Sequence, residues 1–297
     1  MKLKNAILIT GALGGVSYLS YQAIGDQMLK RVFSRIKNKF TPEEKYMEWL
    51  TSSSVTQVKV GSFDGLKLCA YNVHNHEDNR YMILVHGINS DKTLMYERAY
   101  EFDKLGYNLL IIDQRSAGDS EGQYCTYGFK ESQDLQIWIN YLCQKYADVK
   151  ICLYGISMGA ATVMMASAYE LPENVKCLIE DCGYSSLKEE LAYIIRKDYK
   201  LALPGPVLNI IEKKMKERFG MSFDDISPKN ILESNEIPIL FIHGEKDEVV
   251  PFDMAKICYN HNKGIKKYYA VEDAGHIEAY KDPDYYKNLD VFMKEYM

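Results

Sequence analysis

The sequence predicts an α/β fold in which a mostly parallel central sheet is flanked by helices. Short, nearly continuous apolar runs recur along the chain, and strands with this pattern are buried on both faces, as in a parallel sheet. Stretches with helical periodicity separate most of these runs, and repeated strand–helix–strand units are typical of this fold class. The runs are YMILVH, YNLLIID, KICLY, VKCLIE, IPILFIH and KKYYAV.

The first 29 residues form a separate hydrophobic segment. Residues 5–25 carry no charged side chain, and a helix of this length just spans the ~30 Å hydrocarbon layer of a bilayer. We expect a membrane anchor at residues 1–29; a signal peptide cut after Gly25, giving a secreted protein, and a buried N-terminal helix are the alternatives. More basic residues follow residues 5–25 than precede them. By the positive-inside tendency, the part of the chain after the anchor is therefore expected on the cytoplasmic side of the membrane.

Residues 30–54 are predicted to be a polar connector between this segment and the folded domain. Thr41 and Pro42, followed by two glutamates, have the pattern of an N-cap, a first-turn proline and early acids. We expect a short helix from there through Trp49. From Val55 onward the sequence alternates between strand and helix patterns, so residues 55–297 are assigned to one α/β domain.

The domain is expected to begin with a hairpin. The runs VTQVKV and LKLCAYNV flank Asp64-Gly65, a dipeptide that favours a tight turn between antiparallel strands. Helical periodicity then predicts helices after or between the apolar runs, at 93–105, 129–146, 160–169, 252–260 and 283–296.

One interval is too long for an ordinary connection between two elements. More than fifty residues, 181–236, separate VKCLIE from IPILFIH. They contain two stretches with helical periodicity joined by the LPGP break at 203–206. We interpret residues 185–232 as a helical cap inserted over the edge of the sheet.

Two segments match the G-x-S-x-G signature of a nucleophilic serine, GDSEG at 118–122 and GISMG at 155–159. The signature requires a strand that enters a sharp turn and leads directly into a helix. GISMG satisfies this, because KICLY precedes it immediately and an alanine-rich helical stretch follows. The strand before GDSEG ends earlier, at Asp113, so Ser120 is assigned to a structural loop and Ser157 is the candidate nucleophile.

A serine nucleophile needs a base to take its proton and a carboxylate to orient that base. Loops that follow parallel strands meet at the carboxyl edge of the sheet. Asp247 follows IPILFIH and His276 follows KKYYAV, so both are expected at the edge that holds Ser157. Asp181, which follows VKCLIE, is the alternative acid, and His243 at a strand end is assigned a packing role.

The oxygen of the attacked carbonyl needs two N–H donors. The backbone N–H of Met158, directly after the candidate nucleophile, is expected to be one of them. The other is expected from Ile88, in the loop after YMILVHG, with His86 and Gly87 shaping that loop.

Composition and charge argue against several other classes of function. The net charge is -5 and no basic stripe with interleaved aromatic residues occurs, so nucleic-acid binding is not expected. The seven cysteines form neither C-x-x-C nor zinc-finger spacings, and such scattered thiols fit a reducing compartment. The expected chemistry requires neither a metal nor an organic cofactor.

The motifs HGINS, DQRSAGDSEG, GISMG, FIHGEKDEVVP and AGH, in this order, resemble the α/β-hydrolase superfamily. More closely, they are similar to bacterial hydrolases related to prolyl-oligopeptidase and serine-aminopeptidase-type enzymes. The resemblance covers about residues 55–297 and implies the α/β-hydrolase fold, with the D-x-R-x-x-G-x-S loop in a structural role. The site roles that it implies are Ser157 as nucleophile, Asp247 as acid, His276 as base, and Ile88 and Met158 at the oxyanion positions.

The predicted function is a serine hydrolase that cleaves small to medium carboxylic esters through an acyl-enzyme, with amides or thioesters as alternative substrates. A serine aminopeptidase is the nearest alternative and would need acidic side chains near Ser157 to hold the substrate's ammonium group. Glu189 and Glu190 of the cap are candidates, although glutamates on a cap helix are more often solvated. A non-catalytic binding protein with this fold is the third alternative, and the complete set of triad residues argues against it.

Overall fold

The computed structural model describes residues 18–34 and 40–297. Its centre is an eight-stranded sheet with strand order β1-β2-β4-β3-β5-β6-β7-β8. The pairs β1–β2 and β2–β4 are antiparallel and all other neighbours are parallel, which confirms the predicted fold class. The strands are β1 (Val55–Gly61), β2 (Lys67–Val73), β3 (Arg80–Val85), β4 (Asn108–Asp113), β5 (Lys150–Ile156), β6 (Val175–Asp181), β7 (Ile239–Gly244) and β8 (Lys266–Val271).

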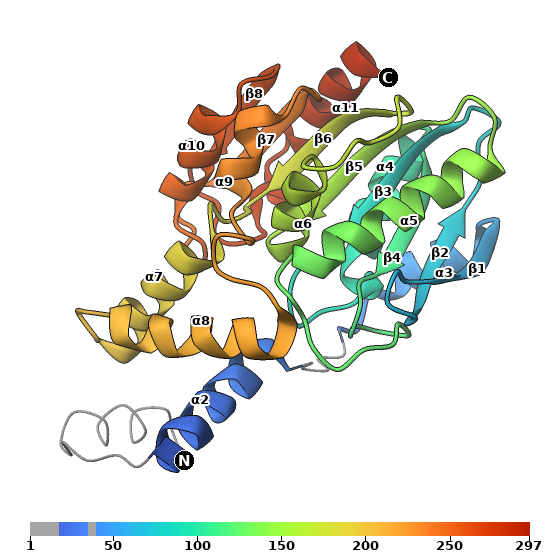
Figure 1. The fold of residues 1–297 in the computed structure, drawn as a ribbon. Helices are drawn as coiled ribbons and strands as arrows, with labels where there is room; N and C mark the ends of the chain where they lie inside the picture. The colour runs from blue at the N-terminus through green and yellow to red at the C-terminus, as the bar shows by residue number, and fades with distance from the viewer. Residues whose placement is uncertain (1–17, 35–39) are drawn as a thin grey trace.

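Helices cover both faces of the sheet, and each layer has its own apolar core (Figure 1). On one face lie α3 (Glu44–Ser52), α4 (Tyr96–Lys104), which follows the short η1 (Lys92–Met95), and α11 (Tyr285–Tyr296). On the other lie α5 (Phe129–Lys145), α6 (Met158–Ala166) and α10 (Phe252–His261). Strands β4 and β7, which have neighbours on both sides, are buried at every position, which explains why their sequences are nearly continuous apolar runs.

The residues between β6 and β7 form helices at the carboxyl edge of the sheet, of which α7 and α8 lie at the lower left of Figure 1. Its helices are α7 (Leu187–Tyr199), α8 (Gly205–Phe219) and α9 (Pro228–Ile231), followed by η2 (Leu232–Ser234). We use "cap" for residues 185–232. The cap has a third apolar cluster of its own, which also includes side chains of α2 (Tyr18–Phe33).

Helix α2 packs against α8 of the cap and crosses the predicted boundary between the hydrophobic segment and the connector. The Lys214 ammonium of α8 lies 2.8 Å from the Asp26 carboxylate, and Phe33 is fully buried in the cap cluster. Helix α2 continues to Phe33 as a packed helix, so it extends past residue 30, where the connector was predicted to begin.

Within the ranges 18–34 and 40–297, no helix has both the length and the apolar character needed to cross a bilayer. Residues 1–17 of the predicted anchor lie outside the described part of the chain, so the membrane anchor stays a prediction.

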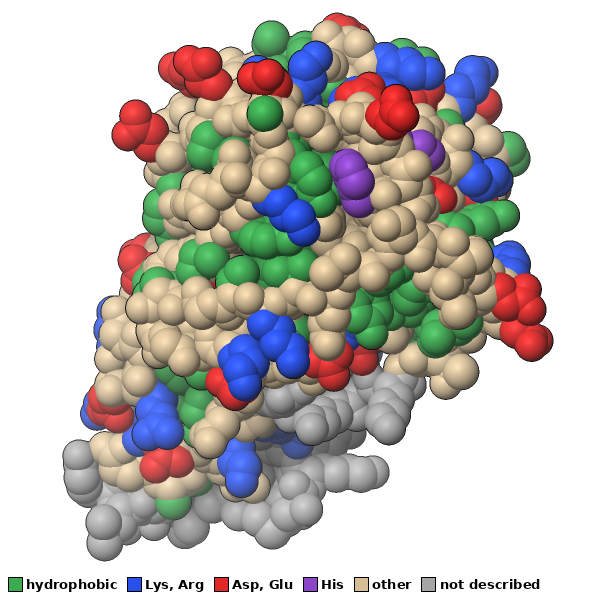
Figure 2. Space-filling model, turned by 90° about the vertical axis from the view of Figure 1, so that its right-hand side faces the viewer, with side chains coloured by type: hydrophobic (Ala, Val, Ile, Leu, Met, Phe, Trp, Pro, Cys, Tyr) green, Lys and Arg blue, Asp and Glu red, His purple; other side chains and the backbone are tan. Residues whose placement is uncertain are grey.

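Two smaller details also differ from the sequence predictions. Helix α3 begins at Glu44 with Glu43 as its N-cap, not at Thr41, because Glu43 keeps an extended backbone and its carbonyl accepts from the Tyr46 N–H. Helix α6 begins at Met158, immediately after the candidate nucleophile, two residues earlier than predicted. On the face shown in Figure 2, acidic and basic side chains are interspersed and apolar side chains gather across the middle.

Candidate active site

Ser157 sits on a sharp turn between β5 and α6. Its backbone angles are φ 54° and ψ −121°, a strained conformation for a residue with a side chain. The turn is possible because the two glycines that flank it have no side chain, which lets their backbone lie against neighbouring backbone. A Cβ on Gly155 would lie 2.2 Å from the Gly159 carbonyl oxygen, and one on Gly159 would lie 2.1 Å from the Val85 carbonyl oxygen.

This geometry predicts that Gly155→Ala destabilises the protein by about 3 kcal/mol or more, because the added methyl overlaps rigid backbone. Gly61→Ala is the matched control, since nothing lies within 4 Å of a Cβ at that position. Denaturant unfolding of both variants measures the difference. Equal stabilities would contradict the close packing of the turn.

The structure brings the candidate triad side chains together. The His276 Nε2 lies 3.0 Å from the Ser157 Oγ, and the His276 Nδ1 lies 2.7 Å from the Asp247 Oδ2. Because an ionised carboxylate can only accept, Nδ1 carries the proton and Nε2 is left free to accept from the serine hydroxyl. Residues from three separate loops thus form one hydrogen-bonded chain, with Ser157 6 % exposed.

Asp247 is held as a carboxylate by its surroundings. Its Oδ1 accepts from the backbone N–H groups of Val249 and Val250, at 2.8 and 2.9 Å. Burial raises the pKa of the Asp247 carboxyl, but hydrogen bonds from His243 and His276 outweigh it and keep the pKa well below its ordinary value. An ionised Asp247 is what a triad acid requires, since it stabilises the imidazolium that forms during attack.

His243 contributes more than the packing role assigned to it from the sequence. Its Nε2 lies 2.9 Å from the Val250 carbonyl oxygen and 3.2 Å from the Asp247 Oδ2. The imidazole is fully buried and electrostatically coupled to Glu180 on β6. The spacing of four residues between His243 and Asp247, across the end of a strand, is the only signal of this contact in the sequence.

Glu180 makes stability depend on pH. Burial raises the pKa of this carboxyl to about 8, although His243 opposes the shift. An unfolded glutamate titrates near ~4.3. Between these values the folded state keeps a proton that the unfolded state loses, so the free energy of unfolding falls as pH rises, by up to ~1.4 kcal/mol per pH unit.

We therefore expect the free energy of unfolding to fall less steeply in Glu180→Gln than in the wild type between pH 5 and 8. Denaturant titrations across this range measure the slope, and the exposed Glu272→Gln serves as control. Identical slopes in all three proteins would show that Glu180 is ionised when folded.

The two predicted oxyanion donors belong to segments that adjoin the serine. Met158 is the first residue of α6, where backbone N–H groups have no partner within the helix. The Ile88 loop approaches from β3, and a Cβ on Gly87 would lie 3.3 Å from the Ser157 Cβ. The buried His86 fixes this loop: its Nε2 accepts from the Gln114 N–H at 3.1 Å, so its Nδ1 donates to the Gly87 carbonyl at 2.7 Å.

The rival serine and the rival acid occupy other positions. The Ser120 hydroxyl donates to the Asp113 carbonyl at 2.7 Å and accepts from the Cys69 N–H at 2.9 Å, which ties its loop to β2 and β4. The Asp181 carboxylate accepts from the Tyr285 hydroxyl at 2.7 Å and makes no hydrogen bond to His276.

One group of side chains in the described ranges has the spacing of a metal site. Ligand atoms of Cys182, Asp247 and His276 all lie within 4.8 Å of one another. Burial raises the pKa of the Cys182 thiol well above its usual value, so the thiolate that a metal binds is disfavoured. Because Asp247 and His276 already bond to each other, the arrangement suits proton transfer better than metal binding.

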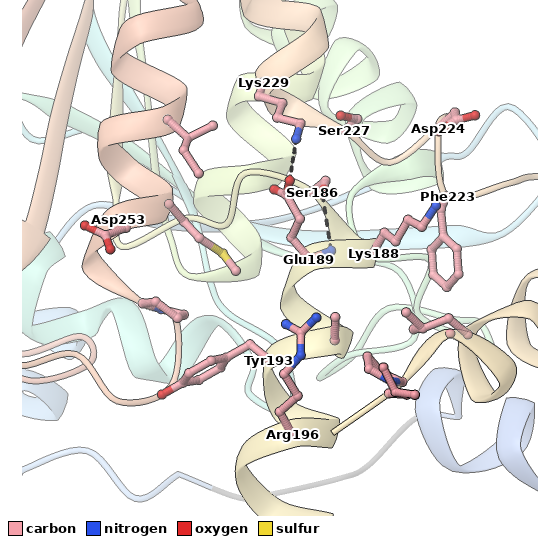
Figure 3. Close-up of a pocket in the computed structure, with 18 of the residues that line it drawn as sticks. Ser186, Lys188, Glu189, Tyr193, Arg196, Phe223, Asp224, Ser227, Lys229 and Asp253 are labelled. Carbon is pink, nitrogen blue, oxygen red and sulfur yellow. Dashed lines mark hydrogen bonds and ion pairs between the residues drawn. The ribbon is translucent and has the colours of Figure 1, made fainter. Parts of the chain in front are cut away.

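A large cavity lies between the cap helices and α10. It has a volume of about 1070 Å³ and lies between α7, α8 and α10, with Tyr193 and Arg196 of α7 among its lining residues (Figure 3). Glu189 faces this cavity and pairs with Lys229. None of the triad residues lines the cavity, so we do not assign it to the acyl group.

Glu190 differs from its expected solvated position. It is 5 % exposed, on the side of α7 turned toward the apolar cluster of the cap. The neighbouring Glu189, in contrast, is partly exposed. Sequence periodicity could not separate these two adjacent glutamates, because the surface that buries Glu190 comes from distant loops.

Comparison with known proteins agrees with this fold. Residues 81–223 match the family model described as alpha/beta hydrolase fold. The chain is 30% identical over 226 residues to the uncharacterized protein YqkD of Bacillus subtilis. The aligned region covers 76% of this chain and 74% of the relative.

Solved structures show the same architecture. The Pyrococcus furiosus esterase Pf2001 superposes with a TM-score of 0.71 at 22% identity, over 89% of this chain and 98% of the esterase. The Pyrococcus horikoshii acylaminoacyl peptidase superposes with a TM-score of 0.59 at 17% identity, over 85% of this chain and 43% of the peptidase.

Proposed function

Because this chain belongs to the α/β-hydrolase superfamily, we propose that it is a serine hydrolase that cleaves carboxylic esters through an acyl-enzyme on Ser157. The fold and the esterase among the similar structures support hydrolase activity. The observation that carries the finer proposal is the hydrogen-bonded chain from the Ser157 hydroxyl through His276 to Asp247.

In the first half of the reaction, the Ser157 Oγ attacks the ester carbonyl carbon while the His276 Nε2 takes the hydroxyl proton. Asp247, ionised and bonded to the Nδ1–H, stabilises the imidazolium that results. The backbone N–H groups of Ile88 and Met158 bind the negative oxygen of the tetrahedral intermediate. The intermediate collapses as His276 returns the proton to the leaving alcohol, and the acyl group stays on Ser157.

In the second half, water takes the place of the alcohol. The His276 Nε2 removes a proton from that water as it attacks the acyl-enzyme carbonyl. The second tetrahedral intermediate expels the Ser157 oxygen, which recovers its proton from His276, and the carboxylic acid leaves. Every proton passes through one imidazole, so the reaction depends on that ring keeping its tautomer.

A series of 4-nitrophenyl esters from acetate to decanoate tests the proposal. We expect turnover of short to medium chains, with the cap limiting the longer ones. An amino-acid 4-nitroanilide tests amide cleavage in parallel. Absence of turnover with every ester, in protein shown to be folded by circular dichroism, would overturn the esterase proposal.

A further inference from the structure

His276 lies in a turn that is strained at the residue after it. The Glu278 N–H donates to the Gly275 carbonyl at 3.2 Å, so His276 and Ile277 are the two central residues of the turn. Ile277 has φ 62°, whereas a positive φ at the third position of a turn normally takes glycine or asparagine. A β-branched residue keeps such a backbone only where its surroundings hold it. The turn that orients the His276 ring therefore needs a contact that fixes it.

Arg98 of α4 makes that contact. Its Nη2 donates to the Ile277 carbonyl at 3.0 Å, although the two residues are 179 positions apart in the chain. The same guanidinium lies 4.0 Å from the centre of the Tyr280 ring, in the short η3 (Ala279–Lys281) of the same loop. A cation is attracted to the face of an aromatic ring. Both contacts therefore join one side chain to the residues that follow His276.

The burial of Arg98 is hard to explain by stability alone. The residue is 2 % exposed and its Nε has no hydrogen-bond partner. Lys92 and Arg115, which are also buried, pair with buried carboxylates. In the described ranges no carboxylate forms an ion pair with Arg98. Burying a charge without an ionic partner costs free energy, which points to a role for Arg98 in holding the loop.

The loop is tied down on both sides of His276. Before it, the Lys246 N–H donates to the Ala274 carbonyl at 3.0 Å, which joins the start of the loop to the loop that carries Asp247. After it, the tie is Arg98, whose helix α4 packs into the apolar cluster on one face of the sheet and so provides a rigid support. His276 lies between these two fixed points.

We propose that Arg98 is a positioning residue of the triad, which clamps the loop after His276 so that the imidazole stays between the Ser157 Oγ and the Asp247 carboxylate. This inference rests on the proposed function, because it concerns the same Ser157 site. Without the clamp, the Ile277 turn relaxes to an unstrained backbone and the His276 ring loses its alignment. Because His276 acts in both halves of the reaction, both halves slow while substrate binding changes little.

Arg98→Met tests the proposal, since methionine keeps an apolar stem at this position but cannot donate a hydrogen bond. We expect kcat for a 4-nitrophenyl ester to fall by roughly 10- to 100-fold, with KM within about threefold of wild type, as for a small misplacement of a reacting group. The rate of labelling by a fluorophosphonate probe is expected to fall by a similar factor, because it also depends on His276. Unfolding curves show whether the variant is folded.

Arg80→Met is the matched control. Arg80 also lies over a tyrosine ring, that of Tyr107, and pairs with Asp78, but it is at the amino end of β3, away from Ser157. We expect this variant to keep the kcat and the labelling rate of the wild type within a few fold.

Proton NMR provides a readout that a purely structural role of Arg98 would leave unchanged. The His276 Nδ1–H, bonded to the Asp247 Oδ2 at 2.7 Å, is expected to give a downfield resonance that is missing from His276→Ala. We expect this resonance to broaden or shift in Arg98→Met and to stay as in the wild type in Arg80→Met.

Wild-type kcat and labelling rate in folded Arg98→Met, or an unchanged His276 resonance, overturn the positioning role but leave the hydrolase intact. A loss of kcat that Arg80→Met shares overturns it as well. A wild type that reacts with the fluorophosphonate but cleaves no ester overturns the esterase proposal, and the labelling rate then still tests Arg98.

Discussion

Replacing His276 by alanine is expected to lower ester turnover by roughly 10⁶-fold, the size of effect seen when a triad base is removed elsewhere. Without the imidazole, no other side chain of the described residues forms a hydrogen bond with the Ser157 hydroxyl and could take its proton, and neither the leaving alcohol nor the attacking water is activated. Steady-state kinetics with a 4-nitrophenyl ester measure the loss. Unfolding curves show whether the variant is folded, which we expect because His276 lies in a surface loop after β8.

His261→Ala provides the comparison for this experiment. His261 lies at the end of α10 and pairs with Glu233, away from the triad. We expect the His261→Ala variant to turn over ester at a rate within a few fold of wild type. A His276→Ala protein that is folded and still turns over ester at a rate close to wild type would remove His276 from the mechanism.

Asp247→Asn is expected to retain the fold and lower turnover by roughly 10⁴-fold, as neutralising a triad acid does in other serine hydrolases. The carboxylate selects the His276 tautomer, because it accepts from Nδ1–H and leaves Nε2 free. An amide can present its N–H to Nδ1 instead, which moves the ring proton to Nε2 and blocks acceptance from Ser157. The loss should therefore appear in kcat, with little change in KM.

Asp181→Asn separates the two candidate acids. The Asp181 carboxylate accepts a hydrogen bond from the Tyr285 hydroxyl, so the Asp181→Asn variant is expected to lose stability. Its ester turnover is expected to stay within about tenfold of wild type. Near-normal turnover in Asp247→Asn combined with a large loss in Asp181→Asn would transfer the acid role to Asp181.

Much of this fold could be predicted from the sequence because its strands are buried on both faces. Runs such as NLLIID in β4 are apolar because helices cover the strand on both faces of the sheet. The position of Ser157 could be predicted for a different reason. Only the second G-x-S-x-G segment follows a strand without a gap, and the turn there needs both glycines.

The remaining features depend on contacts that no local pattern encodes. Helix α2 continues to Phe33 because that ring packs into the cap cluster, and the cap begins about 150 residues further along the chain. Glu190 is buried and Glu189 is not, although they are adjacent on α7, because distant loops cover only one side of the helix. The approach of His243 to Asp247 depends on how the loop after β7 turns.

Covalent labelling by a fluorophosphonate probe, with the modified peptide identified by mass spectrometry, tests the central claim most directly. We predict stoichiometric labelling at Ser157 in the wild type and in Ser120→Ala, and none in Ser157→Ala. Labelling that persists in folded Ser157→Ala, or that maps to Ser120, would contradict the assignment of the nucleophile.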